Sequence, residues 1–230
     1  MRSLTVMALL LSSLAGLAQA ADSPPAAGAA HLYRLDTNYQ VVLPAQPVST
    51  KPGQIEVLDF FWYGCPHCNA LEPYLESWEH SKPANVVLVR VPAILREEWE
   101  PAARAYYTAE ALGILDKSHA ATFDEIHKKG DNLQTEADFE RFYVKAFGVD
   151  PKKFESTWSS PALDAKIAQA KVFVERYDVM GFGVPTLVVN GKWITGGGFG
   201  GAAGSPPAQI MPVVSFLVAQ EQAALPAATK

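Results

Sequence analysis

The spacing of apolar residues changes along the chain, and each change marks an expected element. Residues 54–63 (QIEVLDFFWY) and 85–94 (NVVLVRVPAI) are nearly continuous apolar runs, which are typical of strands buried on both faces of a sheet. Between them, residues 67–80 place apolar side chains at helical spacing. This pattern predicts a helix after the first strand, and Pro73 is expected to kink it.

The middle of the chain shows only the helical period. Residues 96–177 carry several apolar stripes at spacings of three and four, and we interpret these stripes as core. Thr135 and Asp138 predict a capping box at the start of one helix. Ser160 before Pro161 predicts the start of another. The sequence therefore predicts an all-helical block.

Strand signals frame this block on both sides. Asn190-Gly191 separates two β-rich runs and is a strong signal for a tight hairpin. A last helix is expected after Pro206 or Pro212. Near the other end, residues 31–35 and 39–43 predict short edge strands.

The order of these elements favours one α/β domain that is interrupted by a helical insertion. We assign residues 31–95 and 178–225 to the α/β domain and residues 96–177 to the insertion. The pattern contains no internal repeat and no long linker.

The first thirty residues differ from the rest. Residues 1–20 combine Arg2, a short apolar core and a small-residue end, which predicts a secretory signal peptide that is cut after Ala20. The apolar core is shorter than the roughly 20 residues that a membrane-spanning helix needs. Residues 21–30 are small and proline-bearing and predict a disordered leader. Export implies a compartment in which disulfides persist.

Composition narrows the possible functions further. The net charge of the 230 residues is −5, without a clustered basic face, so the sequence gives no indication of nucleic-acid binding. The chain has two cysteines, Cys65 and Cys68, only three positions apart. A loop this short would stabilise the fold very little as a disulfide, because the entropy removed from the unfolded chain grows with loop length. The pair therefore points to thiol–disulfide chemistry.

The sequence around the pair predicts how the two sulfurs differ. Pro66 suits the first position of a helix, which places Cys65 at the helix N-terminus, where free amides and the helix dipole favour a negative sulfur. His67 would favour the thiolate further. Cys68 lies one turn later and is expected to be the buried, resolving thiol.

The size of this effect can be estimated. If Cys65 titrated near ~4 instead of ~8.5, its thiolate would stabilise the reduced form by roughly 4 kcal/mol at pH 7, which equals roughly +90 mV in reduction potential. Stabilising the dithiol makes the disulfide a better oxidant.

Two structural interpretations of the pair are weaker. A closed zinc site usually needs four ligands, and the chain has no second cysteine pair and no histidines at ligand spacing. A buried structural disulfide is the other alternative. We therefore expect neither a metal nor an organic cofactor.

The segments VLDFFWYG (57–64), CPHC (65–68) and GVPTLVVNGK (183–192) together resemble the DsbA-type thiol:disulfide oxidoreductases. This family consists of bacterial periplasmic enzymes with a thioredoxin fold and a helical insertion, and the resemblance covers nearly all of the chain after the signal peptide. An acidic cysteine and an oxidising disulfide are known for this family, so the resemblance by itself also implies a low pKa for Cys65.

The resemblance implies that Cys65 is the exposed nucleophile and Cys68 its buried partner, and it implies roles for further residues. Val184-Pro185 would form a cis-proline loop that faces the disulfide and binds an extended substrate segment. Asp59, the one acid in the first buried strand, would accept the proton of Cys68 during exchange, since burial raises the pKa of a carboxyl. The family tends to have Glu at this place, and a paired structural carboxylate is the alternative for Asp59.

Three aromatic residues precede the cysteines, and we expect apolar contacts with substrate from Phe61, Trp62 or Tyr63. Gly64 departs from the bulkier residue of many relatives and would leave a bare approach to Cys65. The glycine-rich stretch 196–204 lacks the context of a phosphate loop, so it predicts a flexible connector.

The sequence thus predicts a monomeric oxidase that donates its disulfide to unfolded or partly folded secreted proteins in the periplasm. The resemblance implies that a quinone-linked membrane protein of the DsbB type reoxidises it. A reductase or isomerase on the same fold is the first alternative, although the dimerisation segment of such isomerases is not found. A peptide- or metal-binding module without enzymatic activity is the second.

Overall fold

The computed structural model describes residues 33–200 and 204–226. The predicted signal peptide and leader lie outside these residues, and so do residues 201–203 of the glycine-rich stretch. Within the described ranges, no helix combines the length and the apolar character needed to cross a membrane.

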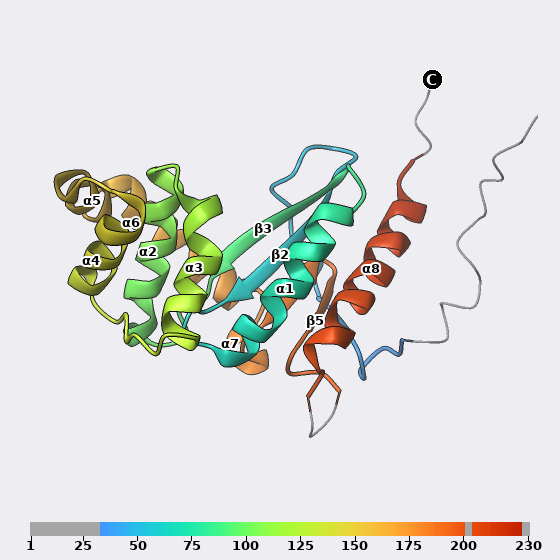
Figure 1. The fold of residues 1–230 in the computed structure, drawn as a ribbon. Coiled ribbons are helices and arrows are strands. Elements are labelled where there is room, and N and C mark those ends of the chain that lie inside the picture. The colour runs from blue at the N-terminus through green and yellow to red at the C-terminus, as the bar shows by residue number, and fades with distance from the viewer. Residues whose placement is uncertain (1–32, 201–203, 227–230) are drawn as a thin grey trace, which may run out of the picture.

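One mixed sheet forms the centre of the fold (Figure 1). In the described part of the chain its strand order is β1-β5-β4-β2-β3, and only β2 and β3 run parallel. The bounds are as follows: β1 Gln40–Val41, β2 Ile55–Phe61, β3 Val86–Pro92, β4 Thr186–Val189 and β5 Trp193–Gly196.

The strands agree with the apolar runs, with two differences. β2 is buried at every position, as its continuous run predicts, because strands lie on both sides of it and helices on both faces. β3 is only partly buried because it is an edge strand. Residues 39–43 contain the edge strand β1, whereas in the described part of residues 31–35 only Leu35 forms an isolated bridge, with Tyr39.

Two helices cover one face of the sheet (Figure 1). They are α1, Pro66–Ser81, and α8, Pro207–Ala224, so the last helix begins directly after Pro206. Val57 of β2 and Leu75 of α1 share a buried cluster with Leu217 of α8. The same face of β2 carries Asp59, since alternate residues of a strand point to the same side.

The opposite face meets the helical block, which lies beside the sheet in Figure 1. Residues 96–177 are helical as predicted, and both predicted helix starts are present: Thr135 and Asp138 form a capping box, and Ser160 caps the helix that begins at Pro161. The block comprises η2 Glu97–Trp99, α2 Glu100–Ala111, α3 Leu115–His127, α4 Glu136–Phe147, α5 Pro151–Trp158 and α6 Pro161–Arg176.

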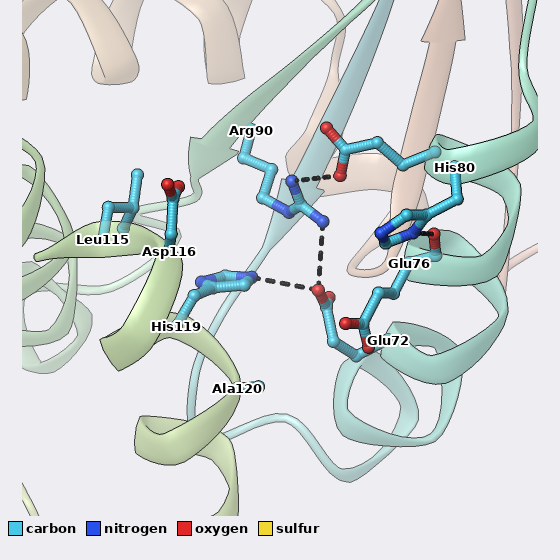
Figure 2. Close-up of a pocket in the computed structure, with 9 residues that line it drawn as sticks. Glu72, Glu76, His80, Arg90, Leu115, Asp116, His119 and Ala120 are labelled. Atoms are coloured by element: carbon cyan, nitrogen blue, oxygen red, sulfur yellow. Dashed lines mark hydrogen bonds and ion pairs between the residues drawn. The ribbon is translucent and has the colours of Figure 1, made fainter.

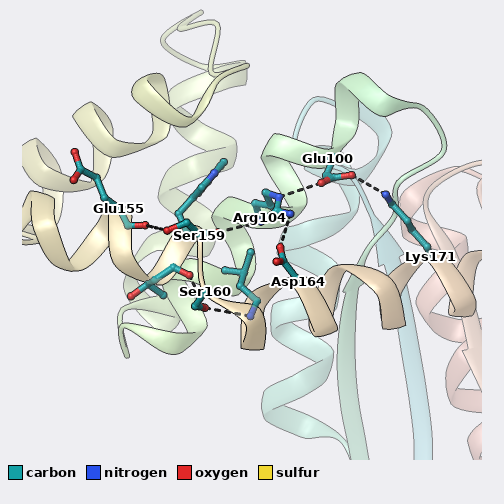
Figure 3. A network of polar contacts seen from close by, with 10 residues as sticks. Glu100, Arg104, Glu155, Ser159, Ser160, Asp164 and Lys171 are labelled. Atoms are coloured by element: carbon teal, nitrogen blue, oxygen red, sulfur yellow. Dashed lines mark hydrogen bonds and ion pairs between the residues drawn. The ribbon is translucent and has the colours of Figure 1, made fainter.

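Arg104 of α2 connects three helices of this block (Figure 3). Its guanidinium donates to the carbonyl of Trp158 at 3.0 Å and contacts Asp164 of α6 at 2.7 Å. It also pairs with Glu100 at 3.0 Å, and Glu100 in turn pairs with Lys171 at 2.7 Å. Because the carbonyl at the end of α5 is one of its partners, Arg104 holds the junction of α5 and α6 against α2.

The chain returns to the sheet through the short helix α7, Val179–Phe182, and the predicted hairpin. Asn190 and Gly191 both have positive φ angles, 52° and 66°, as a tight turn at Asn-Gly requires. The following glycines were expected to be a flexible connector. Instead, Phe199 is buried and stacks on Phe182, with ring centroids 5.3 Å apart.

Close backbone contact explains why glycine is needed here. A Cβ on Gly196 would overlap the carbonyl oxygen of Pro185, and one on Gly198 would lie 2.6 Å from the carbonyl oxygen of Phe182. Residues 196–198 thus pack directly against the loop of residues 182–185, which leads into β4.

Replacing Gly196 with alanine should therefore destabilise this loop. Gly113→Ala is the matched control, because Gly113 also has a positive φ, of 68°, but a Cβ there meets nothing within 4 Å. We expect Gly113→Ala to cost about 1 kcal/mol of unfolding free energy and Gly196→Ala about 2 kcal/mol more, as overpacking does. Denaturant titrations of both variants measure the difference, and equal losses would contradict the close contact.

Candidate active site

The cysteine pair lies where β2 passes into α1. Cys65 is the N-cap residue of α1, Pro66 is the first helical residue, and the Cys65 amide donates to the Trp62 carbonyl at 2.9 Å. Both cysteines are free thiols in the structure. Cys68 is 3% exposed and is the more buried of the two, as predicted. Cys65 was expected to be exposed but is only 7% exposed, because the loop at Val184 lies against its sulfur.

The two thiols are shifted in opposite directions. A hydrogen bond from the Cys68 side chain lowers the pKa of Cys65 to about 6, together with the backbone amides of Cys68 and His67 and the charge of His67, although burial opposes the shift. The pKa of Cys68 is raised well above its ordinary value, first by burial and then by its position beside Cys65. The direction predicted for Cys65 is therefore present, with a smaller size than a pKa near 4 would give.

The loop that faces Cys65 comes from the far end of the chain. The Val184-Pro185 peptide bond is cis, as the resemblance implies, and the Val184 carbonyl lies 3.5 Å from Cys65 Sγ as a hydrogen-bond acceptor. His67 and Pro66 are exposed at the start of α1. Between His67 and this loop lies a cavity of about 310 Å³, which is also lined by Phe182 and Ile210.

Asp59 lies in the middle of β2, and its charge contributes to the raised pKa of Cys68. It is 2% exposed, and its Oδ1 has no hydrogen-bond partner. Burial raises the pKa of this carboxyl to about 7, assisted by Glu72 and opposed by Arg90. The upward direction agrees with the prediction, and the missing partner speaks against a paired structural carboxylate.

Arg90, the cation beside Asp59 in the sheet, forms its ion pairs with other carboxylates. Arg90 pairs with Asp59 in the register of β2 and β3, yet its terminal nitrogens contact Glu72 at 3.1 Å and Glu79 at 3.0 Å (Figure 2). Glu72 also contacts His119 Nε2 of α3 at 3.3 Å. These side chains line a cavity of about 440 Å³ between α1 and α3.

This cluster is only partly visible in the sequence. Glu72 lies four positions after Cys68, so helical spacing already places both on one face of α1. Arg90 and His119 come from β3 and α3, and their approach to the site depends on the tertiary fold.

Two of the three aromatic contacts expected for substrate are wrong. Phe61 and Tyr63 are 2% and 1% exposed and lie in the core between β2 and α3, because both side chains point from the strand end toward the helical block. Tyr63 is held at two points: its hydroxyl lies 2.9 Å from His119 Nδ1, and its carbonyl accepts from His127 Nε2 at 2.8 Å.

Trp62 is only partly buried. Its position shows that the expected bare approach to Cys65 at Gly64 is wrong. The indole of Trp62 lies where a Cβ of Gly64 would be, so the approach beside Cys65 is covered by a neighbouring ring and is not bare. Trp62 in turn stacks on Trp99, with ring centroids 4.2 Å apart and an interplanar angle of 2°.

The described residues contain no group of three or more His, Cys, Asp or Glu side chains suited to a metal ion. A dithiol at a helix N-terminus, opposite a cis-proline loop and above a buried carboxylate, defines a thioredoxin-like thiol–disulfide exchange site.

Comparison with known proteins identifies the family. A family model described as a DSBA-like thioredoxin domain matches residues 86–202. The thiol:disulfide interchange protein DsbA of Burkholderia cepacia is 37% identical over 222 residues, which cover 95% of this chain and 96% of that protein. Its counterpart from Pseudomonas aeruginosa is 37% identical over 225 residues, covering 97% of this chain and 99% of that protein.

Solved structures agree with this assignment. The crystal structure of P. aeruginosa DsbA matches with a TM-score of 0.75 at 37% identity, covering 84% of this chain and 96% of the other. The oxidoreductase DsbA from Xylella fastidiosa also has a TM-score of 0.75, at 30% identity, covering 84% of this chain and all of the other. The chain belongs to the DsbA family of thioredoxin-fold proteins.

The raised pKa of Asp59 predicts a pH effect on stability. The folded protein holds a proton on this carboxyl up to about pH 7, whereas the unfolded chain releases it near pH 4, so folding loses stability as the pH rises from about 4 to 7. The loss corresponds to roughly 4 kcal/mol. Asp59→Asn should remove this loss, so that the variant gains stability relative to the parent above pH 7.

Denaturant unfolding of both oxidised proteins between pH 4 and pH 8 measures this gain, because no thiol of the folded state titrates in the oxidised form. A stability difference that stays constant over this range would show that Asp59 titrates normally.

Proposed function

We propose that this protein is a thiol:disulfide oxidase that donates a Cys65–Cys68 disulfide to pairs of thiols in exported proteins. The observation that carries the proposal is the contrast between the two sulfurs: the pKa of Cys65 is lowered to about 6 and that of Cys68 is raised. Family membership and the names of the relatives as thiol:disulfide interchange proteins support the reaction class.

The contrast sets the order of the steps. A substrate thiolate attacks Cys65 Sγ, the bond between the two enzyme sulfurs breaks, and Cys68 leaves and takes up a proton. A second substrate thiolate then attacks the substrate sulfur of the mixed disulfide, and Cys65 leaves as a thiolate. The substrate loses two electrons and the enzyme gains them.

Asp59 suits the proton transfer at Cys68. Since its pKa is about 7, it is close to half protonated at neutral pH and can supply a proton when Cys68 leaves. In the reverse direction, when the disulfide is formed again, it can accept the proton of Cys68.

The lowered pKa of Cys65 also sets the direction of electron flow. With a pKa of about 6, the thiolate stabilises the reduced protein by about 1.4 kcal/mol at pH 7, which equals about 30 mV in reduction potential. This is about a third of the value that the sequence suggested, with the same sign. The sign favours an oxidase over a reductase, which is the second candidate.

Substrate polypeptide would lie over the loop of Val184-Pro185 and the adjoining cavity of about 310 Å³. Its apolar lining and exposed backbone suit an extended segment of an unfolded chain. We place this reaction in the periplasm, with a DsbB-type membrane protein that reoxidises the dithiol, on the basis of the apolar N-terminal segment and the family. We expect a monomer.

Thiolate absorbance tests the charge on Cys65. Titration of the reduced protein at 240 nm should show a midpoint near pH 6. His67→Ala should raise this midpoint, because the charge of His67 is one cause of the lowered pKa. Cys65→Ala is the control and should abolish the low transition. A midpoint near 9 in the parent protein would remove the basis for an oxidase.

Trapping tests the donor role directly. In Cys68→Ala a mixed disulfide forms when the Cys65 thiolate attacks a disulfide of an exported protein and one protein sulfur leaves as a thiolate, which is the reverse of the last donating step. No second enzyme thiol can then release it, so exported proteins should accumulate on Cys65. Mass spectrometry after non-reducing purification identifies them, and Cys65→Ala with Cys68→Ala provides the matched blank. An exporting cell in which the variant holds no more protein than the blank would contradict the proposal.

A further inference from the structure

A second cavity is lined by the segment before Cys65 and by the helical block. Its volume is about 340 Å³, and Gly64, the residue directly before Cys65, lines it. The cavity of about 310 Å³ that we propose for substrate shares no lining residue with this second cavity. It is lined by His67, two residues after Cys65. Two separate cavities are therefore lined by residues within two positions of Cys65 in the chain.

The wall of this second cavity is aromatic. Trp62 and Trp99 both line it, and their indole planes are parallel within 2°. Neither ring is fully buried. Gly64 allows this arrangement, because any larger residue there would collide with the Trp62 ring. A flat, partly open pair of tryptophans favours contact with a further aromatic or large apolar group.

The other lining residues indicate the polarity and charge of a group that would bind in this cavity. Ala102, Ile126 and Leu133 extend the apolar surface. Arg96 and Glu98 carry opposite charges, so the rim selects neither sign. Asn132 and Gln134 bring amide groups that can both donate and accept hydrogen bonds, which suits a peptide backbone.

We infer that this cavity is a second substrate subsite, which binds an aromatic or large apolar side chain close to the substrate cysteine. The inference rests on the proposed function, since a polypeptide bound to Cys65 is what brings such a side chain here. In an extended chain, two residues span about 7 Å. Gly64, which lines the cavity, directly precedes Cys65 in the chain, so a side chain near the substrate cysteine can reach the cavity. The subsite makes the protein prefer cysteines with an aromatic neighbour on one flank.

Oxidation kinetics of short dithiol peptides test this preference. Four peptides differ only in having Phe or Ser two residues before or two residues after the cysteine that forms the mixed disulfide. On one flank, we expect kcat/KM with the oxidised protein to be about tenfold higher for Phe than for Ser, which corresponds to 1.4 kcal/mol. Trp99→Ala should reduce this ratio to about one.

A matched control distinguishes an effect of this cavity on the kcat/KM ratio from an effect of losing any exposed aromatic residue. Tyr74 is an exposed aromatic residue of α1 that does not line either cavity, and Tyr74→Ala should keep the tenfold ratio. If the parent protein oxidises all four peptides at equal rates, or if Trp99→Ala keeps the preference, the subsite is refuted while the oxidase activity stands. If no peptide is oxidised, the proposed function itself fails.

A measurement on folded protein complements the kinetics. The peptide with Phe on the preferred flank carries a nitroxide next to the phenylalanine and is attached to Cys65 of the Cys68→Ala variant through a disulfide. The tryptophans of this variant are labelled with ¹⁵N. The indole N–H signals of Trp62 and Trp99 should broaden, whereas that of Trp193, which donates to Glu221 at 2.8 Å, should stay sharp. Sharp signals for Trp62 and Trp99 would overturn the inference.

Discussion

The stabilisation of a negative charge on one sulfur determines how the rest of this site is arranged. Cys65 is the N-cap residue of α1, where backbone amides and the thiol of Cys68 point to its sulfur. One turn further, the same helix carries Cys68 into the core, where burial suppresses ionisation. A single helix terminus therefore provides two thiols of opposite character, and Cys65, with the lower pKa, is the better leaving group when a mixed disulfide between Cys65 and a substrate breaks.

Burying the carboxyl of Asp59 without a partner costs folding stability. Asp59 has an oxygen without a partner, while the cation beside it in the sheet binds Glu72 and Glu79. A carboxyl in this position would be more stable with an ion pair, but an ion pair would fix it as an anion. Leaving Asp59 unpaired keeps it able to exchange a proton near neutral pH, which is the property that the proposed proton transfer at Cys68 requires.

Much of this arrangement follows from the sequence alone. The run of residues 54–63 predicts β2, Pro66 predicts the start of α1, and Asn190-Gly191 predicts the hairpin, because each of these signals is local. The orientation of Phe61 and Tyr63 was not predictable, since a continuous apolar run does not reveal which neighbours cover each face. Arg90 and His119 approach the site only through the packing of β3 and α3.

The hydrogen bonds of Tyr63 have a mechanical consequence. His119 and His127 are two turns apart on α3, and they contact the hydroxyl and the carbonyl of a residue that is two positions from Cys65. The segment before Cys65 is thus anchored to the insertion at two points, in addition to its attachment to the sheet. A rotation of the insertion would pull on the reactive loop, so the geometry presented to an incoming thiol is controlled by both parts of the molecule together.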